Sequence, residues 1–181
     1  MLKKNIFIVL LLLFWVRTQA QEDNSVFQFL KLPFSSHAAA LGGENISIIE
    51  DDLTMAVHNP ALLSCVADKT LNLNYTLYIA GVNAASAAFS RVLGDRSTWA
   101  VTAQFVNYGT MKETTSENII IGTFSAKDMA FSGIYSYDLS DYWSGGVKAN
   151  LIYSNYDKFS SFAIGVDLGL NYYHQNSDFS F

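Results

Sequence analysis

The sequence predicts an all-β protein, an antiparallel transmembrane β-barrel preceded by a short helical segment. Three observations lead to this prediction. Long stretches alternate apolar with small or polar residues, as residues 162–173 (FAIGVDLGLNYY) do, and this alternation is typical of strands with two unlike faces. The stretches run about ten to fifteen residues, where soluble strands usually have ~5–6 and a tilted membrane strand needs ~9–11. Aromatic residues gather near their ends, where barrels carry aromatic girdles.

The N-terminus predicts export. Residues 1–20 combine Lys3 and Lys4, an apolar run over 6–16, and a Thr-Gln-Ala exit that ends at Ala20. The run is too short for a spanning helix, which needs ~20 apolar residues, and is typical of a secretory signal peptide. We therefore assign residues 1–20 as a signal peptide and exclude them from the fold.

Charge and cysteine content exclude several classes of function. Removing Lys3, Lys4 and Arg17 from the 11 basic residues leaves 8 against 16 acidic ones. An acidic chain without a basic cluster argues against nucleic acid as a partner. Cys65 is the only cysteine, so the chain has no internal disulfide and no CxxC site. An exported chain without disulfides fits a bacterial envelope protein.

Residues 21–68 predict a compact segment of short helices and turns. An Ala-rich run ends at Gly42-Gly43, where a helix C-cap would lie. Asp51 or Asp52 is placed to cap a helical turn over residues 53–57. Asn59-Pro60 breaks that turn, and Pro60 can open another at 61–64.

Strands are predicted from residue 69 to the end of the chain, with no second domain boundary. Short turns join several of them, such as Gly94-Asp95-Arg96, and a long polar connection over residues 108–127 contains an apolar island at 119–121. Residues 82–93 are rich in Ala and Ser, and their alternation is too weak to assign faces. The six expected strands are 71–79, 82–93, 99–105, 129–137, 143–154 and 160–174.

Periodicity alone does not say which face of these strands points inward, because a soluble sandwich buries its apolar face and a membrane barrel turns that face to lipid. The predicted strand 143–153 helps, since its apolar face begins at Trp143 and ends at Tyr153. Ten residue steps at ~3.3 Å and ~40° of tilt give about 25 Å, the separation of two aromatic girdles. We therefore expect the apolar faces to point to lipid, with Asp167 and Asn171 pointing into the barrel.

The chain also resembles a known family. The stretches FQFLKLPFSSHAAALGGENISIIEDDLTMAVHNPALL, LNLNYTLYIAGVNAASAAFS, FVNYG and GTFSAKDMAFSGIYSYDLS resemble the outer-membrane barrel proteins of the type IX secretion system of Bacteroidetes-type bacteria. That group includes PorV and is similar to the FadL fatty-acid transporters. The resemblance covers nearly all of residues 21–181, and its most specific part is Leu41-Gly42-Gly43 followed by Asn59-Pro60-Ala61.

Two departures from the family pattern matter. His37 stands where an arginine is expected in the SARxAALGG-like stretch. Members are also about twice as long, so residues 69–181 correspond to about half of a FadL-like barrel, and we expect the chain to be an N-terminal fragment or a truncated gene model. The resemblance further implies that residues 21–68 form a plug-like segment inside the lumen.

No group of residues predicts an enzyme, a cofactor or a metal site. Three adjacent carboxylates lack the EF-hand spacing and are typical of a cap or a solvated turn. The three histidines show no metal-ligand spacing, and the cysteine is most simply a small buried residue. Lys148 and Asp167 are expected to be lumenal charges or an ion pair. The groups weighed and set aside are Glu50, Asp51, Asp52, His37, His58, His174 and Cys65.

Three functions follow as alternatives. By resemblance, the chain is a non-enzymatic component of type IX protein secretion in the bacterial outer membrane, anchoring surface partners that process and attach secreted proteins. Its partners would be outer-membrane lipid and other secretion-system proteins at the cell surface, with residues 108–127 as the contacting loop. The first alternative is a FadL-like transporter, whose partner would be a hydrophobic small molecule. The second is a soluble β-sandwich adhesin, in which the apolar faces would pack on each other.

Overall fold

The computed structural model describes residues 27–116, 119–157 and 159–173. The predicted signal peptide, residues 1–20, lies outside these residues, as does His174. No helix among the described residues has both the length and the apolar character needed to cross a membrane. The helical elements are η1 (Gln28–Lys31), α2 (Ser36–Ala40), η2 (Met55–Val57), η3 (Pro60–Cys65) and η4 (Ile79–Gly81).

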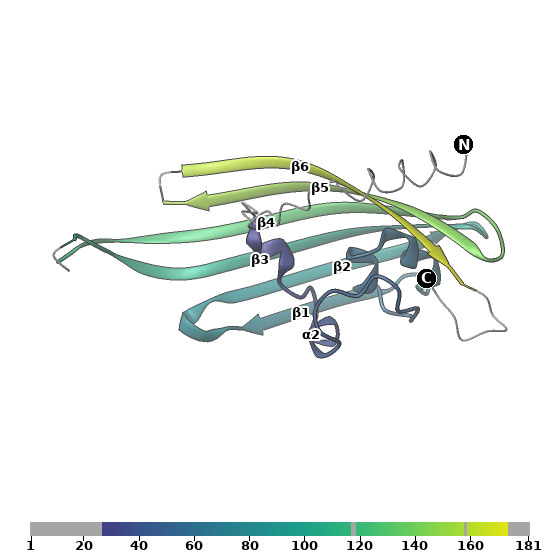
Figure 1. The fold of residues 1–181 in the computed structure, drawn as a ribbon, viewed down its shortest axis with the longest axis horizontal. Coiled ribbons are helices and arrows are strands. Elements are labelled where there is room, and N and C mark those ends of the chain that lie inside the picture. The colour runs from purple at the N-terminus through teal and green to yellow at the C-terminus, as the bar shows by residue number, and fades with distance from the viewer. Residues whose placement is uncertain (1–26, 117–118, 158, 174–181) are drawn as a thin grey trace, which may run out of the picture.

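The strands form one antiparallel sheet in which each strand pairs with the next in sequence (Figure 1). The all-β prediction is confirmed. Over the described residues β1 and β6 each pair on one side only, so the sheet is open along these two strands. The strands are β1 (Leu71–Leu77), β2 (Asn83–Leu93), β3 (Ser97–Thr114), β4 (Ile120–Asp138), β5 (Trp143–Tyr156) and β6 (Phe159–Tyr172).

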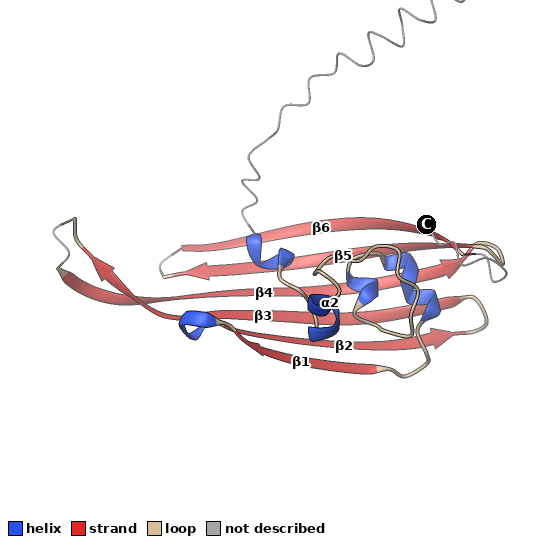
Figure 2. Ribbon diagram, turned by 60° about the horizontal axis from the view of Figure 1, so that its bottom comes forward, coloured by secondary structure: helices blue, strands red, loops and turns tan. Residues whose placement is uncertain are grey.

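The prediction of a polar connection over residues 108–127 is wrong. β3 continues to Thr114 and β4 begins at Ile120, and the two remain paired beyond the ends of the other strands, as both ribbon views show (Figures 1 and 2). A register shift between Asn107 and Thr110 marks where this extension leaves the sheet, and Gly109 there has a φ of 75°. Glycine adopts such a φ without a steric cost, which suits the irregular step.

The turns predicted between residues 35 and 65 are present. Ser35 is the N-cap of α2, and its side chain accepts from the Ala38 N–H; after the helix, the Gly43 N–H donates to the Ala38 carbonyl at 2.8 Å. Asn59 has extended backbone, and its side chain accepts from the Ala61 N–H at the start of η3. The predicted effect of Pro60 on its neighbour is thereby confirmed.

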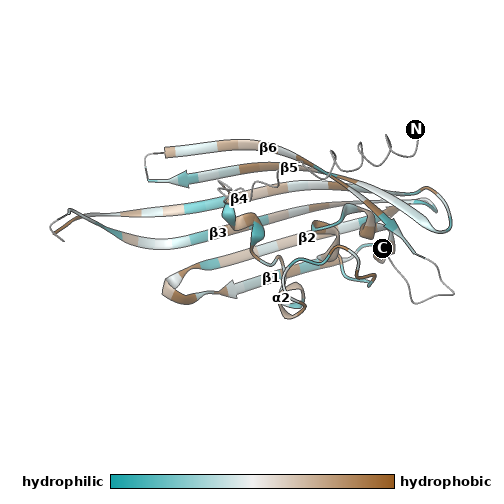
Figure 3. Ribbon diagram, viewed as in Figure 1, coloured by the Kyte–Doolittle hydropathy of each residue, from teal (hydrophilic) through white to brown (hydrophobic). Residues whose placement is uncertain are grey.

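The two faces of the sheet are opposite in character. On one face of β6 the apolar residues of the 162–173 stretch are exposed, from 55% for Leu170 to 78% for Leu168. β1 repeats this pattern with Leu71, Leu73 and Leu77. The buried face carries mostly polar and small residues, together with Val106, Ile134 and Ile152. Hydropathy accordingly alternates along the strands (Figure 3). As expected, the polar face is the covered one at Asn171, which is buried while its apolar neighbour Leu170 is exposed. Asp167, on the same face as Asn171, is half exposed.

The strand registers align residues of the exposed apolar face into rows that run across the sheet. One row is entirely polar over β2 to β6: Asn83, Asn107, Lys127, Asn155 and Ser160. The next row is rich in aromatic residues: Tyr75, Ala85, Phe105, Met129, Tyr153 and Phe162. Near the opposite ends of the strands, Trp143 pairs with Tyr172, and their rings lie 4.9 Å apart. The apolar band is therefore bounded by aromatic residues on both sides.

The core lies between the sheet's polar face and the residues that precede β1. We call residues 27–70 the N-terminal segment; its helices all lie over one face of the sheet (Figure 2). Phe34, Leu53 and Leu63 of this segment are almost completely buried against the small side chains of Ala88 and Ala100 and against Ile134. Burial of each large side chain contributes about 1.5–3 kcal/mol. The sheet buries apolar area only where this segment covers it.

Candidate functional site

The contact between the N-terminal segment and the polar face of the sheet is the candidate functional site. It joins residues that lie about a hundred positions apart in the sequence, as in the bond from Asn59 Nδ2 to the Leu170 carbonyl at 3.4 Å. Asn59 Nδ2 also donates to the Ile46 carbonyl at 2.7 Å. Asn59 thus holds its own turn, the preceding loop and β6 together with a single side chain.

Two glycines open a slot for this turn. Gly146 on β5 and Gly169 on β6 are directly paired, and the Asn59-Pro60-Ala61 backbone lies against both. A methyl group on Gly146 would lie 2.5 Å from the Pro60 carbonyl oxygen, and one on Gly169 would lie 2.7 Å from Pro60 Cδ. Real side-chain carbons do not approach so closely. The absence of side chains at this glycine pair is therefore what allows η3 to sit on the sheet.

A chain of polar side chains crosses the sheet beside the slot. Lys148 Nζ donates to the Val57 carbonyl at 2.8 Å and forms an ion pair with Asp167 at 3.2 Å. Asn150 Nδ2 donates to the same carboxylate at 2.8 Å, and Asn150 Oδ1 accepts from the Ser132 hydroxyl at 2.7 Å. The predicted Lys148–Asp167 pair is confirmed. Because Lys148 also binds the Val57 carbonyl, the pair fixes the N-terminal segment to the sheet.

A cavity of about 440 Å³ lies between the N-terminal segment and this polar chain. Its walls include Lys148, Asp167 and Asn150 on the sheet and His58 and Glu44 on the segment, with apolar residues such as Phe34 and Ile152 between them. His58 Nε2 is buried without a hydrogen-bond partner. Burial, reinforced by the charge of Lys148, lowers the pKa of His58 below its ordinary value of 6.5. The walls of the cavity are therefore partly charged and partly apolar, and the cavity adjoins the imidazole of His58.

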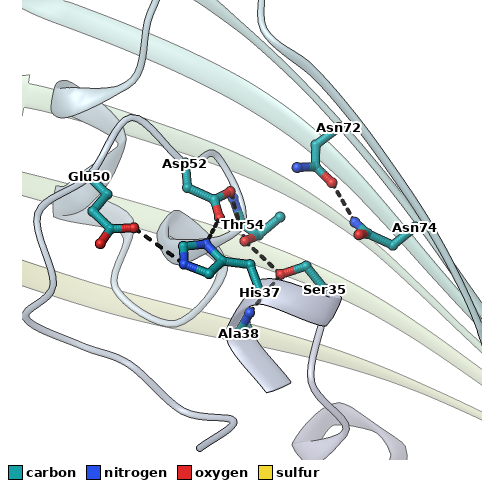
Figure 4. Close-up of polar contacts among 8 residues, drawn as sticks. All are labelled: Ser35, His37, Ala38, Glu50, Asp52, Thr54, Asn72 and Asn74. Atoms are coloured by element: carbon teal, nitrogen blue, oxygen red, sulfur yellow. Dashed lines mark hydrogen bonds and ion pairs between the residues drawn. The ribbon is translucent and has the colours of Figure 1, made fainter. Parts of the chain in front are cut away.

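His37 joins α2 to the loop that follows it. Its Nδ1 lies 2.6 Å from Asp52 Oδ2, and its Nε2 lies 3.5 Å from Glu50 Oε2 (Figure 4). Asp52 also accepts from the Thr54 N–H and hydroxyl, both at 2.8 Å. The bond to Asp52, aided by both negative charges, raises the pKa of His37. Burial opposes ionisation of Asp52, yet the bonds from His37 and Thr54 outweigh it and lower the pKa of Asp52.

The His37–Asp52 contact is expected to be strongest between about pH 3.8 and pH 6.5. Protonated His37 stabilises the fold fully below its ordinary pKa of 6.5, and this stabilisation is lost as the pH rises through the raised folded value. Ionised Asp52 stabilises the fold above 3.8, and that contribution is lost as the pH falls through the lowered folded value. An NMR titration of the histidine ring protons checks this. His37 should titrate above 6.5 and His58 below it.

The titration has a matched pair of variants. Asp52→Asn should return the pKa of His37 toward its ordinary value, because the largest cause of the shift is removed. Glu50→Gln should lower it less, since Glu50 acts only through its charge. Equal effects of the two variants would contradict the assignment of Asp52 as the main partner.

A buried carboxylate lies near the opposite ends of the strands. Asp128 is 1% exposed, and its Oδ2 accepts from the Tyr108 hydroxyl at 2.7 Å and the Tyr156 hydroxyl at 2.8 Å. Its Oδ1 has no partner. Sequence reasoning placed Tyr108 in a connection and began the next strand only at residue 129, and therefore missed this cluster. It links three strands where the β3–β4 extension begins.

The other residue groups weighed from the sequence have local structural roles. Asp51 accepts from the Ala67 N–H at 2.7 Å, so the three adjacent carboxylates hold three different contacts. Cys65 is half-buried at the end of η3, and burial raises the pKa of its thiol. Within residues 27–116, 119–157 and 159–173, no three His, Cys, Asp or Glu side chains lie together in an arrangement that could hold a metal ion.

Comparisons with known proteins add no name to this site. No protein-family model matches the chain, and no curated protein matches it. The resemblance noted from the sequence therefore rests only on the residues quoted for it, chiefly Leu41-Gly42-Gly43 and Asn59-Pro60-Ala61. In the structure these motifs end α2 and fill the glycine slot, respectively.

Proposed function

We propose that this chain is PorQ, an outer-membrane β-barrel component of the type IX protein secretion system, and that it anchors surface partners that process and attach secreted proteins. The identification rests on the sequence resemblance. The membrane assignment has independent support from the sheet. On this proposal the chain is not an enzyme. Its described strands are part of a FadL-like barrel, and the N-terminal segment is a plug inside that barrel.

One observation carries the membrane assignment: the apolar face of the sheet is exposed, and the polar face is the one that is covered. A soluble sheet would be destabilised by this arrangement, because burial of apolar area is the main force that stabilises folded domains. Leu73, Ile164 and Leu168 are 70%, 69% and 78% exposed. Patches of this extent mark interaction with protein or lipid. Lipid is favoured here because the exposed residues cover the whole width of the sheet.

The height of the apolar band agrees with a bilayer. From Asn107 in the polar row to Ser97 at the start of β3 the strand advances ten residues. At ~3.3 Å per residue and ~40° of tilt this is about 25 Å, the height of the apolar band in outer-membrane barrels. Bacterial barrels carry short turns on the periplasmic side and longer elements outside. The extended β3–β4 hairpin therefore belongs at the cell surface.

The hairpin is the surface we propose for the partner. Met111 is 37% exposed, and Ile120 and Ile121 on the paired strand are 56% and 60% exposed, although they lie beyond the polar row. These apolar side chains lie outside the proposed membrane band and are exposed to water. Contact with a soluble protein would bury them. The proposed contact thus lies on the segment that the sequence analysis selected, which is a paired hairpin and not a loop.

The test is to express the full reading frame and fractionate the cells. We expect an outer-membrane product with heat-modifiable migration on gels, and capture of other secretion-system proteins by the tagged chain. Replacing Ile120 and Ile121 with serine should reduce capture at least tenfold without changing heat modifiability, because interface truncations of large apolar residues cost about 1–2 kcal/mol each. Leu139→Ser, at the short β4–β5 turn and 59% exposed, is the control. A soluble, folded product would overturn the membrane assignment.

The alternative is a FadL-like transporter of hydrophobic molecules. The cavity beside the N-terminal segment is the observation that bears on it, since Phe34 and Ile152 contribute apolar walls. Lys148 and Asp167 also line this cavity. An apolar chain bound there would exclude water from both charged groups, which is unfavourable. We therefore favour the secretion role. Growth that depends on the chain only when a fatty acid is the carbon source would reverse this preference.

A further inference from the structure

The exposed apolar face contains a hollow of about 420 Å³ over β1 to β4. Its floor is made of alanines on β2 and β3, and its walls are larger side chains on β1, β3 and β4. The register explains the shape. Tyr75 pairs with Ala85, which pairs with Phe105; in the next row Leu73 pairs with Ala87, which pairs with Ala103. The floor residues are Ala85, Ala87 and Ala103, and the walls include Leu73, Tyr75, Phe105, Met129 and Phe131.

The hollow ends at the polar row. Tyr75, Ala85, Phe105 and Met129 form its last apolar row, and Asn83, Asn107 and Lys127 follow two residues further along their strands. Two strand residues span about 6.6 Å. Lys127 is exposed and forms no ion pair within the described residues, and its pairing neighbours Asn107 and Asn155 are uncharged. The ammonium group of Lys127 therefore lies in the row directly beyond the apolar end of the hollow, without a partner among the described residues.

We propose that this face holds one membrane lipid in a defined place, with an acyl chain in the hollow and its phosphate headgroup against Lys127. The hollow supplies the apolar contact, and the ammonium with the amide side chains of Asn83 and Asn107 supplies charge and hydrogen-bond donors for a phosphate. Elsewhere in the polar row no described residue carries a positive charge. The inference rests on the proposed membrane location and adds to it a specific lipid position.

The experiment is native mass spectrometry of the full chain extracted from outer membranes and titrated with dioleoylphosphatidylglycerol. Dioleoylglycerol, which has the same chains and no phosphate, is the matched lipid. We expect one phosphatidylglycerol to bind at least tenfold more tightly than dioleoylglycerol. Lys127→Gln should weaken phosphatidylglycerol binding about tenfold, since bonds to charged groups contribute about 1.5–3 kcal/mol and 1.4 kcal/mol is tenfold. Ala87→Phe should remove the bound lipid by filling the hollow.

Two control variants use the same substitutions elsewhere. Ala149→Phe adds the same ring to the exposed face of β5, outside the hollow, and Lys112→Gln removes a charge from the β3–β4 extension. Neither should change binding. Equal weakening by Ala87→Phe and Ala149→Phe, or equal binding of the two lipids, would overturn the lipid site while a heat-modifiable, membrane-embedded product still upholds the proposed function. A product that never enters the membrane would overturn both.

Discussion

Replacing Gly169 with alanine is expected to displace the Asn59–Pro60 turn from the sheet and to expose η3. The added methyl group would lie 2.7 Å from Pro60 Cδ and would also meet Asn59 Oδ1. Pro60 Cδ belongs to a ring, and Asn59 Oδ1 is held by the Ala61 N–H at 3.1 Å, so the turn must move as a unit. Overpacking of this kind costs about 1–3 kcal/mol. Gly146→Ala should act in the same way, because its methyl group would meet the Pro60 backbone.

Cys65 reports this displacement, since it is the only cysteine and lies at the end of η3. Burial raises the pKa of its thiol, and only the thiolate reacts quickly with a maleimide. We expect the labelling rate in Gly169→Ala to rise about five- to 150-fold, the ratio that corresponds to about 1–3 kcal/mol. Gly165→Ala is the control, because on the same strand its methyl group would meet only Asn150, at an ordinary 3.6 Å. A slot variant that labels no faster than this control would refute the steric account.

Replacing Lys148 with methionine is expected to have the second largest effect on this contact. The Lys148 side chain is 11% exposed. Its ammonium group donates to the Val57 carbonyl and forms an ion pair with Asp167. Methionine keeps most of the side-chain volume and removes the donor. The Val57 carbonyl of the N-terminal segment therefore loses its hydrogen bond from Lys148. An unpaired buried acceptor costs about 1–3 kcal/mol. Cys65 labelling should again become faster, and thermal unfolding of the extracted chain should occur at a lower temperature.

Asp167→Asn separates the two interactions of Lys148. Asp167 is half exposed, so its charge is partly screened and its loss should cost less than about 1 kcal/mol. Lys148 keeps its bond to the Val57 carbonyl in this variant. We therefore expect Cys65 in Asp167→Asn to label at nearly the wild-type rate. If Asp167→Asn and Lys148→Met behaved alike, the ion pair and not the carbonyl bond would hold the segment.

The strands with unlike faces could be predicted from sequence because their alternation is complete. Residues 162–173 place Phe162 and every large aliphatic side chain on one face, and these aliphatic side chains are exposed along β6 in the structure. The faces of β2 could not be assigned because alanine fits both an apolar floor and a polar interior. Its register with Tyr75 and Leu73 decides the matter, and register depends on pairing that a single strand does not reveal.

The β3–β4 extension was missed for a related reason. From Thr110 to Thr114 both faces of β3 are exposed, and the paired residues 120–125 of β4 are exposed or half-buried, so no alternation of apolar and polar residues is required there. Thr110, Lys112 and Thr114 then give the appearance of a polar loop. The glycine slot was missed because Gly146 and Gly169 become neighbours only through pairing of β5 with β6. What the sequence did supply was the other half of the contact, the Asn59-Pro60 turn.

The order of the strands also determines the order in which the parts can assemble. Each strand pairs with the one before it, so the sheet can grow by successive hairpins whose contacts are local in the chain. Local contacts of this kind form quickly. The Asn59–Leu170 bond spans 111 positions, and the glycine slot exists only when β6 has joined β5. The N-terminal segment, although synthesised before every strand, therefore reaches its final place only after β6.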